Sequence, residues 1–202
     1  IEAFWDPLHG RYSAAVKLWA GPQDPWSRAT RAGEVVTRRL VGMTCSSDFV
    51  TWVQPWRIFV PDEEDDGDME FYGMGGVHAR GDLLIGFVRV LRDDLPCDEG
   101  SSPDGIGYTV LGWSRDGVNW TRGREPFLDR GSEPGSWDHA MVWGSSALQR
   151  GNEVLIYYGG YARGHKIGRA TERQIGLARL PVDRYVSRDA GPGGGRLVTS
   201  PI

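Results

Sequence analysis

Two aspartates occupy the same position in successive segments of the chain, a pattern that acid–base chemistry could use. Asp68 precedes the turn residue Gly81 by the same separation as Asp138 precedes Gly151. If such segments are arranged around a common axis, equivalent carboxylates converge on it. One carboxylic acid can then protonate a leaving oxygen while a carboxylate activates water or attacks an anomeric carbon. We therefore predict that Asp68 and Asp138 are catalytic; in the alternative, each caps a turn that enters a strand.

Two glutamates lie close to these aspartates in the sequence. Glu70 follows Asp68 by two residues and would share a strand face with it, which makes Glu70 the best candidate for the acid. Glu133 lies in the loop before Asp138 and is a candidate substrate-binding residue. Burial and like-charge proximity would separate the pKa values of such carboxyl groups and so assign acid and base.

The remaining substrate-binding candidates are mostly aromatic. Nine tryptophans are many for a chain of 202 residues, and Trp and Tyr rings can stack on sugar rings. An imidazole could hydrogen-bond a sugar hydroxyl. On this basis we select Trp137, His139, Trp143 and Tyr158. In the alternative, these side chains pack between sheets or complete the core.

The sequence carries no recognisable metal or cofactor motif. His78, His139 and His165 lack the spacing of a structural zinc site, and Cys45 and Cys97 lie far apart. No phosphate-cradling Gly loop or nucleophile elbow is present. We therefore predict no metal and no cofactor. The two cysteines could pair in an oxidising compartment, but one possible pair does not assign the localisation.

An internal repeat of about seventy residues organises the chain. The pattern S-x-D-x-V-x-W occurs around Asp48 and again, one repeat later, around Asp116, and a degraded copy surrounds Asp183. The turn glycines Gly10, Gly81 and Gly151 follow nearly the same spacing. The short Asp side chain suits a turn because it can accept backbone N–H bonds. The repeat predicts three units, with boundaries near 1–62, 63–131 and 132–202.

Runs rich in Val, Ile, Tyr and Trp between Gly, Asp and Pro clusters predict four strands in each unit. The expected strands are Glu2–Trp5, Tyr12–Trp19, Val35–Cys45 and Arg57–Val60; Glu70–Met74, Leu83–Leu91, Gly107–Trp113 and Pro126–Leu128; and Ala140–Leu148, Val154–Tyr161, Gln174–Leu180 and Arg196–Thr199. Sustained helical periodicity is absent. We therefore expect an all-β fold in which helix is nearly absent.

Four-stranded units repeated radially form a β-propeller, which typically has four to eight blades. Three blades cannot close a ring, so we expect further blades N-terminal to this segment, supplying at least one catalytic carboxylate. The first and last blades would then each leave an apolar face uncovered, with Trp5, Trp19, Val154 and Ile156 on those faces. Such a segment, expressed alone, should be poorly soluble or oligomeric.

The overall composition excludes two classes of partner. The formal net charge is −4, and no basic run marks a nucleic-acid interface. No apolar run is long enough to span a bilayer, and no signal peptide is recognisable. We expect a carbohydrate partner, no nucleic acid and no membrane.

The segment from Ser46 to Trp52, followed by Pro61-Asp62-Glu63 and Asp66, resembles a passage of glycoside hydrolase families 32, 43 and 68, the five-bladed furanosidase propellers. The copy from Trp113 to Trp120 is similar to the matching turn in those families and in the related mannoside phosphorylases. The resemblance covers most of the chain as architecture. The shortened Asp-box of sialidase-type propellers is a competing match.

The chain departs from the furanosidase pattern at the positions that carry chemistry. Trp5-Asp6-Pro7 echoes the family's nucleophile segment, but Asp6 falls in a turn between two expected strands. Trp137-Asp138-His139 stands in a position like the family's R-D-P, without both flanking residues, and no E-C segment exists. The resemblance implies a glycoside hydrolase-like protein with paired carboxylates at the mouth of a propeller channel. The alternative is a non-catalytic carbohydrate-binding or structural propeller module.

Overall fold

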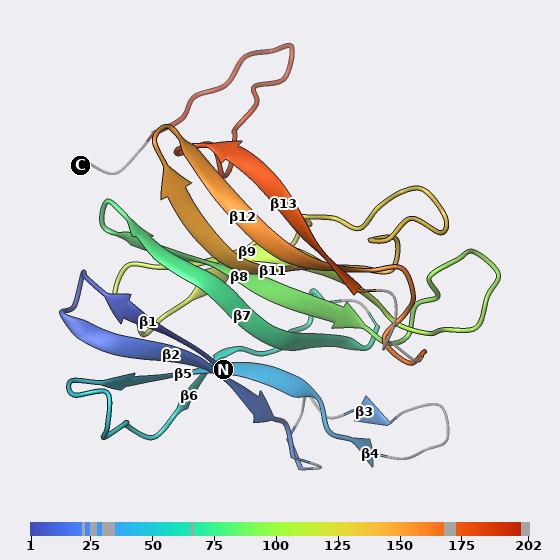
Figure 1. Ribbon diagram of the computed structural model, residues 1–202, viewed down its shortest axis with the longest axis horizontal. Helices are drawn as coiled ribbons and strands as arrows, with labels where there is room; N and C mark the ends of the chain where they lie inside the picture. The colour runs from blue at the N-terminus through green and yellow to red at the C-terminus, as the bar shows by residue number, and fades with distance from the viewer. Residues whose placement is uncertain (22, 25–27, 30–34, 66, 168–172, 199–202) are drawn as a thin grey trace.

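The computed structural model describes residues 1–202 except 22, 25–27, 30–34, 66, 168–172 and 199–202. Every regular element in these described residues is a β-strand, which confirms the expected all-β class. No helix long and apolar enough to cross a membrane occurs in the same part of the chain. The strands form three units along the sequence, arranged as an open fan (Figure 1).

The first unit is an antiparallel sheet of four strands. Their order is β1 (Glu2–Asp6), β2 (Arg11–Trp19), β5 (Arg39–Ser46) and β6 (Trp56–Phe59). A separate short hairpin, β3 (Arg28–Ala29) with β4 (Val35–Val36), lies in the connection between β2 and β5. The strand expected to begin at Val35 therefore begins at Arg39.

The second and third units share one larger sheet. The second comprises β7 (Met69–Arg80), β8 (Leu83–Arg92), β9 (Ile106–Ser114) and β10 (Thr121–Arg122), and the third comprises β11 (Met141–Arg150), β12 (Glu153–Tyr161) and β13 (Arg173–Pro181). A single parallel pair, Met141 with Gly107, joins β11 to β9. The sheets do not close into a ring (Figure 1).

Two of the three predictions of a fourth strand are wrong. In the second unit the strand next to β9 is β10, and the stretch expected around Pro126–Leu128 contributes only an isolated bridge between Leu128 and Thr109. In the third unit, residues 196–198 form no strand, and Thr199 lies outside the described residues. Leu197 and Val198 are mostly exposed, so no burial on a sheet face compensates the entropic cost of ordering them.

The repeated aspartates form the turns that follow β5 and β9. The Oδ1 atom of Asp48 accepts hydrogen bonds from the Val50 and Thr51 N–H groups at 2.8 and 2.7 Å. These bonds lower the pKa of Asp48 to about 2, because they favour its charged form. Asp116 makes the equivalent bonds to Val118 and Asn119. The position after each aspartate has a positive φ, 64° at Phe49 and 67° at Gly117.

Asp6 is also a turn residue. Of its two possible roles, a nucleophile like that of the furanosidases or a turn residue, the structure shows the second. It is fully buried. Its Oδ1 accepts the Leu8 and His9 N–H groups at 3.1 and 3.3 Å, and its Oδ2 lies 2.7 Å from the His9 Nδ1. All of these partners belong to the β1–β2 connection, so the carboxylate is used to close the hairpin.

The core consists of apolar layers between neighbouring units. Met43, Phe59 and Phe71 belong to the layer between the first and second units. Phe87, Val154 and Ile156 belong to a layer between the second and third. The expectation that Val154 and Ile156 lie on an uncovered face is therefore wrong, since both are at most 2% exposed. Trp5 and Trp19 are half-exposed as expected, and in the third unit Ile175 and Leu177 are exposed instead.

Candidate functional site

The first strands of the three units, β1, β7 and β11, contact one another in chain order. A cavity of about 430 Å³ lies between the first and second units, with Glu2, Tyr72 and Arg89 in its lining. A second cavity, of about 240 Å³, lies between the second and third units, with Tyr72, Arg89 and Tyr161 in its lining. Tyr72 and Arg89 line both cavities, so the two cavities are adjacent, and we call them together the inner site.

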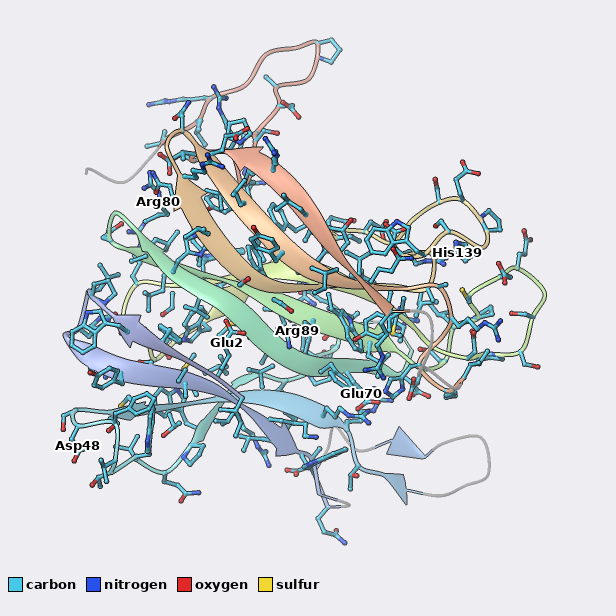
Figure 2. All side chains as sticks on the ribbon, viewed as in Figure 1. Glu2, Asp48, Glu70, Arg80, Arg89 and His139 are labelled. Carbon is cyan, nitrogen blue, oxygen red and sulfur yellow. The ribbon has the colours of Figure 1, made fainter. Side chains whose placement is uncertain are left out.

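Glu2 carries the carboxyl group of the inner site. Its Oε1 accepts a short hydrogen bond from the Gly76 N–H, and its Oε2 lies 3.6 Å from the Arg89 Nη2 (Figure 2). Burial raises the pKa of Glu2 above its ordinary value, and this effect exceeds the lowering by the Gly76 bond and by Arg89. A raised pKa favours the protonated form of the carboxyl group, which is the form that a proton donor needs.

A glycine-containing irregularity in β7 makes room for this carboxyl group. The register of β7 with β8 shifts between Gly75 and His78, and Gly76 has a φ of 61°. A Cβ atom on Gly75 would overlap both the Arg89 Nη2 and the Glu2 Oε2. A Cβ atom on Gly75 would also meet the Ser145 carbonyl at 2.8 Å, so glycine here leaves room for the Glu2–Arg89 pair beside the third unit, and glycine at Gly76 suits the positive φ.

Arg89 links the inner site to the third unit. It lies on β8, and its Nε donates a 2.8 Å hydrogen bond to the Gly144 carbonyl, while its Nη2 lies 3.4 Å from the Ser145 Oγ. Burial lowers the pKa of Arg89, although Glu2 opposes this effect. A single guanidinium thus contacts side chains or backbone of all three units.

Aromatic rings form the other wall of the inner site. Tyr72 stacks on Trp143 with a centroid distance of 4.5 Å and an interplanar angle of 21°. Tyr161 meets the Trp143 ring edge-on at 5.6 Å. Trp143 is almost fully buried, and its Nε1 donates to the Val90 carbonyl at 3.0 Å. Trp143 therefore belongs to the lining of the second cavity and supports the more accessible Tyr72 and Tyr161; its predicted role in substrate binding stays a prediction.

Asp68 and Glu70 lie at the start of β7, and both contact the first unit. Arg38 donates to the Asp68 Oδ1. Arg39 holds the Glu70 Oε2 through its backbone N–H at 2.8 Å and its Nη1 at 3.0 Å. The two ion pairs join Arg38 and Arg39, which belong to the first unit, to carboxylates of the second unit. Neither carboxylate is among the residues that line the inner site.

Asp138 and Glu133 lie in the loop before β11. The Asp138 Oδ1 accepts a hydrogen bond from the Ser136 hydroxyl at 3.0 Å. The side chain of Glu133 is exposed, and its backbone carbonyl accepts the Ser136 N–H at 3.0 Å. No hydrogen bond joins any two of Asp68, Glu70 and Asp138 in the described part of the chain. The hydrogen bonds described for Asp138 and Glu133 therefore both go to Ser136, within the same loop.

The remaining predicted binding residues surround a third cavity, of about 470 Å³, near the loop before β11. Trp137 and His139 are in its lining, together with Asp98. Trp137 stacks on Tyr158 with a centroid distance of 5.7 Å and an interplanar angle of 16°. The buried His139 is held through both ring nitrogens, by the Gly131 carbonyl at 3.0 Å and the Asp98 Oδ1 at 2.9 Å. The predicted residues are thus divided between this cavity and the inner site.

No family model matches the chain, and no curated protein matches it by sequence. Solved structures do match. An N-acetylgalactosamine deacetylase from F. plautii, in complex with blood group B trisaccharide, superimposes with a TM-score of 0.57 at 21% identity, over 90% of this chain and 49% of that one. At this identity the likeness concerns the fold alone.

Two further neighbours agree with this result. The Bombyx mori GH32 β-fructofuranosidase BmSUC1 matches with a TM-score of 0.57 at 16% identity, over 85% of this chain and 30% of that one. The β-1,2-mannobiose phosphorylase from Listeria innocua also has a TM-score of 0.57, at 13% identity, over 89% of this chain and 43% of that one. The chain thus spans half or less of the length of these neighbours, and the likeness concerns the fold.

The sequence analysis missed Glu2, Tyr72, Arg89 and Tyr161. A usable signal existed for Glu2, which precedes its turn glycine by the same separation as Gly73 and Trp143 do in the next two units. Residues at that repeat position line the cavities. The position of Asp68 and Asp138, further ahead of the glycine, instead lies before the strand begins. Arg89 could not be found in this way, because it lies on a second strand and reaches the site only past glycines of β7.

Proposed function

We propose that this chain forms part of a five-bladed β-propeller of the glycoside hydrolase type, with blades near 1–62, 63–131 and 132–202, and that a sugar binds at the inner site. Three observations support the proposal: the likeness to carbohydrate-active folds, the accessible rings of Tyr72 and Tyr161 at the cavities, and a partly buried carboxyl group beside them. The Glu2 carboxyl group in the cavity lining, bonded to the Gly76 N–H and facing Arg89, is the observation that carries the chemistry.

In this proposal Glu2 is the proton donor. Its protonated carboxyl group gives the proton to the glycosidic oxygen as the bond from that oxygen to the anomeric carbon breaks. A water molecule adds to the anomeric carbon and releases one proton, which restores the carboxylic acid. The Gly76 N–H and Arg89 stabilise the carboxylate that exists between these two events.

Hydrolysis also requires a carboxylate that activates water or attacks the anomeric carbon. Asp138 is the first candidate, because its Oδ2 has no hydrogen bond to any described residue, whereas arginines hold both Asp68 and Glu70. Asp68 and Glu70 are the next candidates. Of the substrate-binding residues predicted from the sequence, Trp143 is in the lining of the inner site, Trp137 and His139 are in the lining of the third cavity, and Glu133 and Tyr158 are in neither.

The ion pairs of Asp68 and Glu70 favour the second candidate function, a non-catalytic carbohydrate-binding or structural module. Both carboxylates contribute to contacts between units, as structural residues do. Under this alternative the inner site binds a glycan and releases it unchanged.

Turnover of aryl glycosides, fructans and arabinans by matched variants separates the two functions. We expect Glu2→Gln to reduce kcat/KM by about 10² to 10⁴-fold, the range of general acid catalysis. Glu153→Gln, an exposed glutamate on β12, is the control and should retain activity. Asp138→Asn, Asp68→Asn and Glu70→Gln identify the second carboxylate. Full activity of Glu2→Gln would contradict its role, and glycan binding without turnover of any substrate would favour the module.

A further inference from the structure

Three potential metal ligands converge beside the third cavity, outside the inner site. The Cys97 Sγ, an Asp98 carboxylate oxygen and a His139 ring nitrogen all lie within 4.8 Å of one another. Cys97 and Asp98 are in the loop between β8 and β9, and His139 shortly precedes β11. Two separate loops therefore bring the three side chains together, which explains why their sequence spacing gave no sign of a site.

The hydrogen bonds of His139 point its Nε2 lone pair toward this cluster. A carbonyl oxygen can only accept, so the 3.0 Å contact with the Gly131 carbonyl places the proton on Nδ1. In the neutral ring Nε2 then carries a lone pair, and it faces the Asp98 Oδ1 at 2.9 Å. Two acceptors at this distance need a cation or a proton between them. A backbone carbonyl bonded to the second ring nitrogen is also the usual support of a metal-binding histidine.

The Arg130 guanidinium joins the backbones of the two loops. The Arg130 Nη1 donates to the Cys97 carbonyl at 3.2 Å and to the His139 carbonyl at 2.9 Å. The Asp104 Oδ1 accepts the Cys97 N–H at 2.7 Å, which fixes the first loop internally. Cys97 and His139 are buried, whereas the Asp98 side chain is 61% exposed and can move. Two of the three ligands, Cys97 and His139, are thus held in the interior, and the Asp98 side chain has room to change its conformation.

We propose that Cys97, Asp98 and His139 bind a divalent transition-metal ion, with Zn²⁺ the best fit, and that a fourth coordination position opens into the adjacent cavity. Sulfur and imidazole donors favour zinc over calcium or magnesium, which prefer oxygen. Ligand atoms about 2.0–2.3 Å from a tetrahedral zinc ion lie roughly 3.3–3.8 Å apart. Binding therefore requires the Asp98 oxygen to move away from the His139 Nε2, which it now faces at 2.9 Å, and the Cys97 thiol proton passes to solvent.

The cavity supplies the open side of the proposed site. Asp98 and His139 are part of its lining, and Trp137, Arg163 and Gln174 lie in the rest of it. Three protein ligands beside an accessible space match zinc sites that keep one position for water or a ligand, in contrast to the four protein ligands of closed structural sites. The proposal does not depend on Glu2 or on any glycosidase activity.

Titration of the reduced full chain with Co²⁺ and Zn²⁺ tests the site. We expect one equivalent of Co²⁺ to produce a thiolate-to-cobalt charge-transfer absorption, which one equivalent of Zn²⁺ abolishes. Cys97→Ser should remove the absorption, and Asp98→Asn and His139→Gln should weaken Zn²⁺ binding by at least about 10 to 100-fold. Cys45→Ser is the matched control, since Cys45 is the other free thiol and belongs to the first unit.

Thermal unfolding is a second measurement, which stays informative if a variant of a buried ligand folds poorly. Because Asp98 is exposed, Asp98→Asn should fold normally, and Zn²⁺ should raise the Tm of the wild type and of Cys45→Ser but not of Asp98→Asn. The proposal is overturned if the wild type shows no charge-transfer absorption, if the absorption persists in Cys97→Ser, or if Cys45→Ser abolishes it. A plain His139–Asp98 hydrogen bond would give the first of these results.

Discussion

At the scale of single residues, the two glutamates on the inner strands differ in what surrounds their carboxyl groups. Arg39 holds the Glu70 carboxylate through its backbone and its side chain. Glu2 has one backbone N–H and a guanidinium at 3.6 Å, and burial outweighs both in setting its pKa. The same residue type is thus suited to structural pairing at one position and to proton donation at the other.

We expect Arg89→Gln to raise the pKa of Glu2 further, because the guanidinium charge favours the carboxylate. Carboxyl ¹³C NMR titration of Glu2 in the wild type and the variant measures this effect directly. The folded state binds the Glu2 proton more tightly than the unfolded chain. Its contribution to the free energy of unfolding is therefore present below about pH 4 and is lost as the pH rises through the folded pKa. A lower pKa in Arg89→Gln would contradict this assignment.

At the scale of elements, the irregularity in β7 connects backbone geometry to the inner site. The Gly76 N–H that would otherwise continue the ladder is directed at Glu2, and Gly75 leaves space for Arg89. A β-bulge commonly has this role beside functional sites. The strand β7 thus contributes its backbone to the site, in addition to the Tyr72 ring.

We expect Gly75→Ala to lower the free energy of unfolding by about 1–3 kcal/mol, because its Cβ would overlap the Glu2–Arg89 pair. It should also displace the Glu2 carboxyl group and weaken sugar binding. Urea denaturation and sugar titration measure the two effects. Gly123→Ala is the control, since a Cβ there meets its nearest atom at 3.7 Å. Equal behaviour of the two variants would show that the space at Gly75 is unimportant.

The sequence analysis succeeded where local patterns decide the structure and failed where contacts between units do. Runs rich in Val, Ile and Tyr placed the strands expected at Leu83–Leu91 and Val154–Tyr161 close to their observed bounds, because each run contains residues that the core buries. The strand expected at Arg196–Thr199 failed in its described part, since residues 196–198 have no partner strand. The repeat spacing could have drawn attention to Glu2, but the role of Arg89 depends on packing between units, which neither spacing nor composition reveals.

At the scale of the whole molecule, apolar side chains are exposed on both outer faces of the fan. Trp5 and Trp19 lie on the first unit, and Ile175 and Leu177 lie on β13 of the third. Within the described residues β13 pairs only with β12, so its other edge is also open. Exposed apolar residues beside an unpaired strand edge favour association.

We expect the chain to self-associate through this third-unit surface. The double variant Ile175→Lys/Leu177→Lys should lower the average mass in sedimentation velocity, because it places charge on the exposed face and strand edge. Val186→Lys/Leu197→Lys alters two similarly exposed apolar residues outside the strands and is the control. A monomeric wild type, or equal masses for both double variants, would contradict the prediction.

The central claim is that the inner site binds sugar, and two tyrosines on one strand test it most directly. Tyr161 lines the cavity, whereas Tyr157 lies on the same strand and is 38% exposed outside it. The decisive measurement is calorimetric titration of Tyr161→Ala and Tyr157→Ala with fructan, arabinan and mannan oligosaccharides. We expect Tyr161→Ala to weaken binding about tenfold or more, the effect of losing roughly 1.4 kcal/mol of contact, and Tyr157→Ala to bind as the wild type does. Unchanged binding in Tyr161→Ala, or equal loss in both variants, would contradict the account.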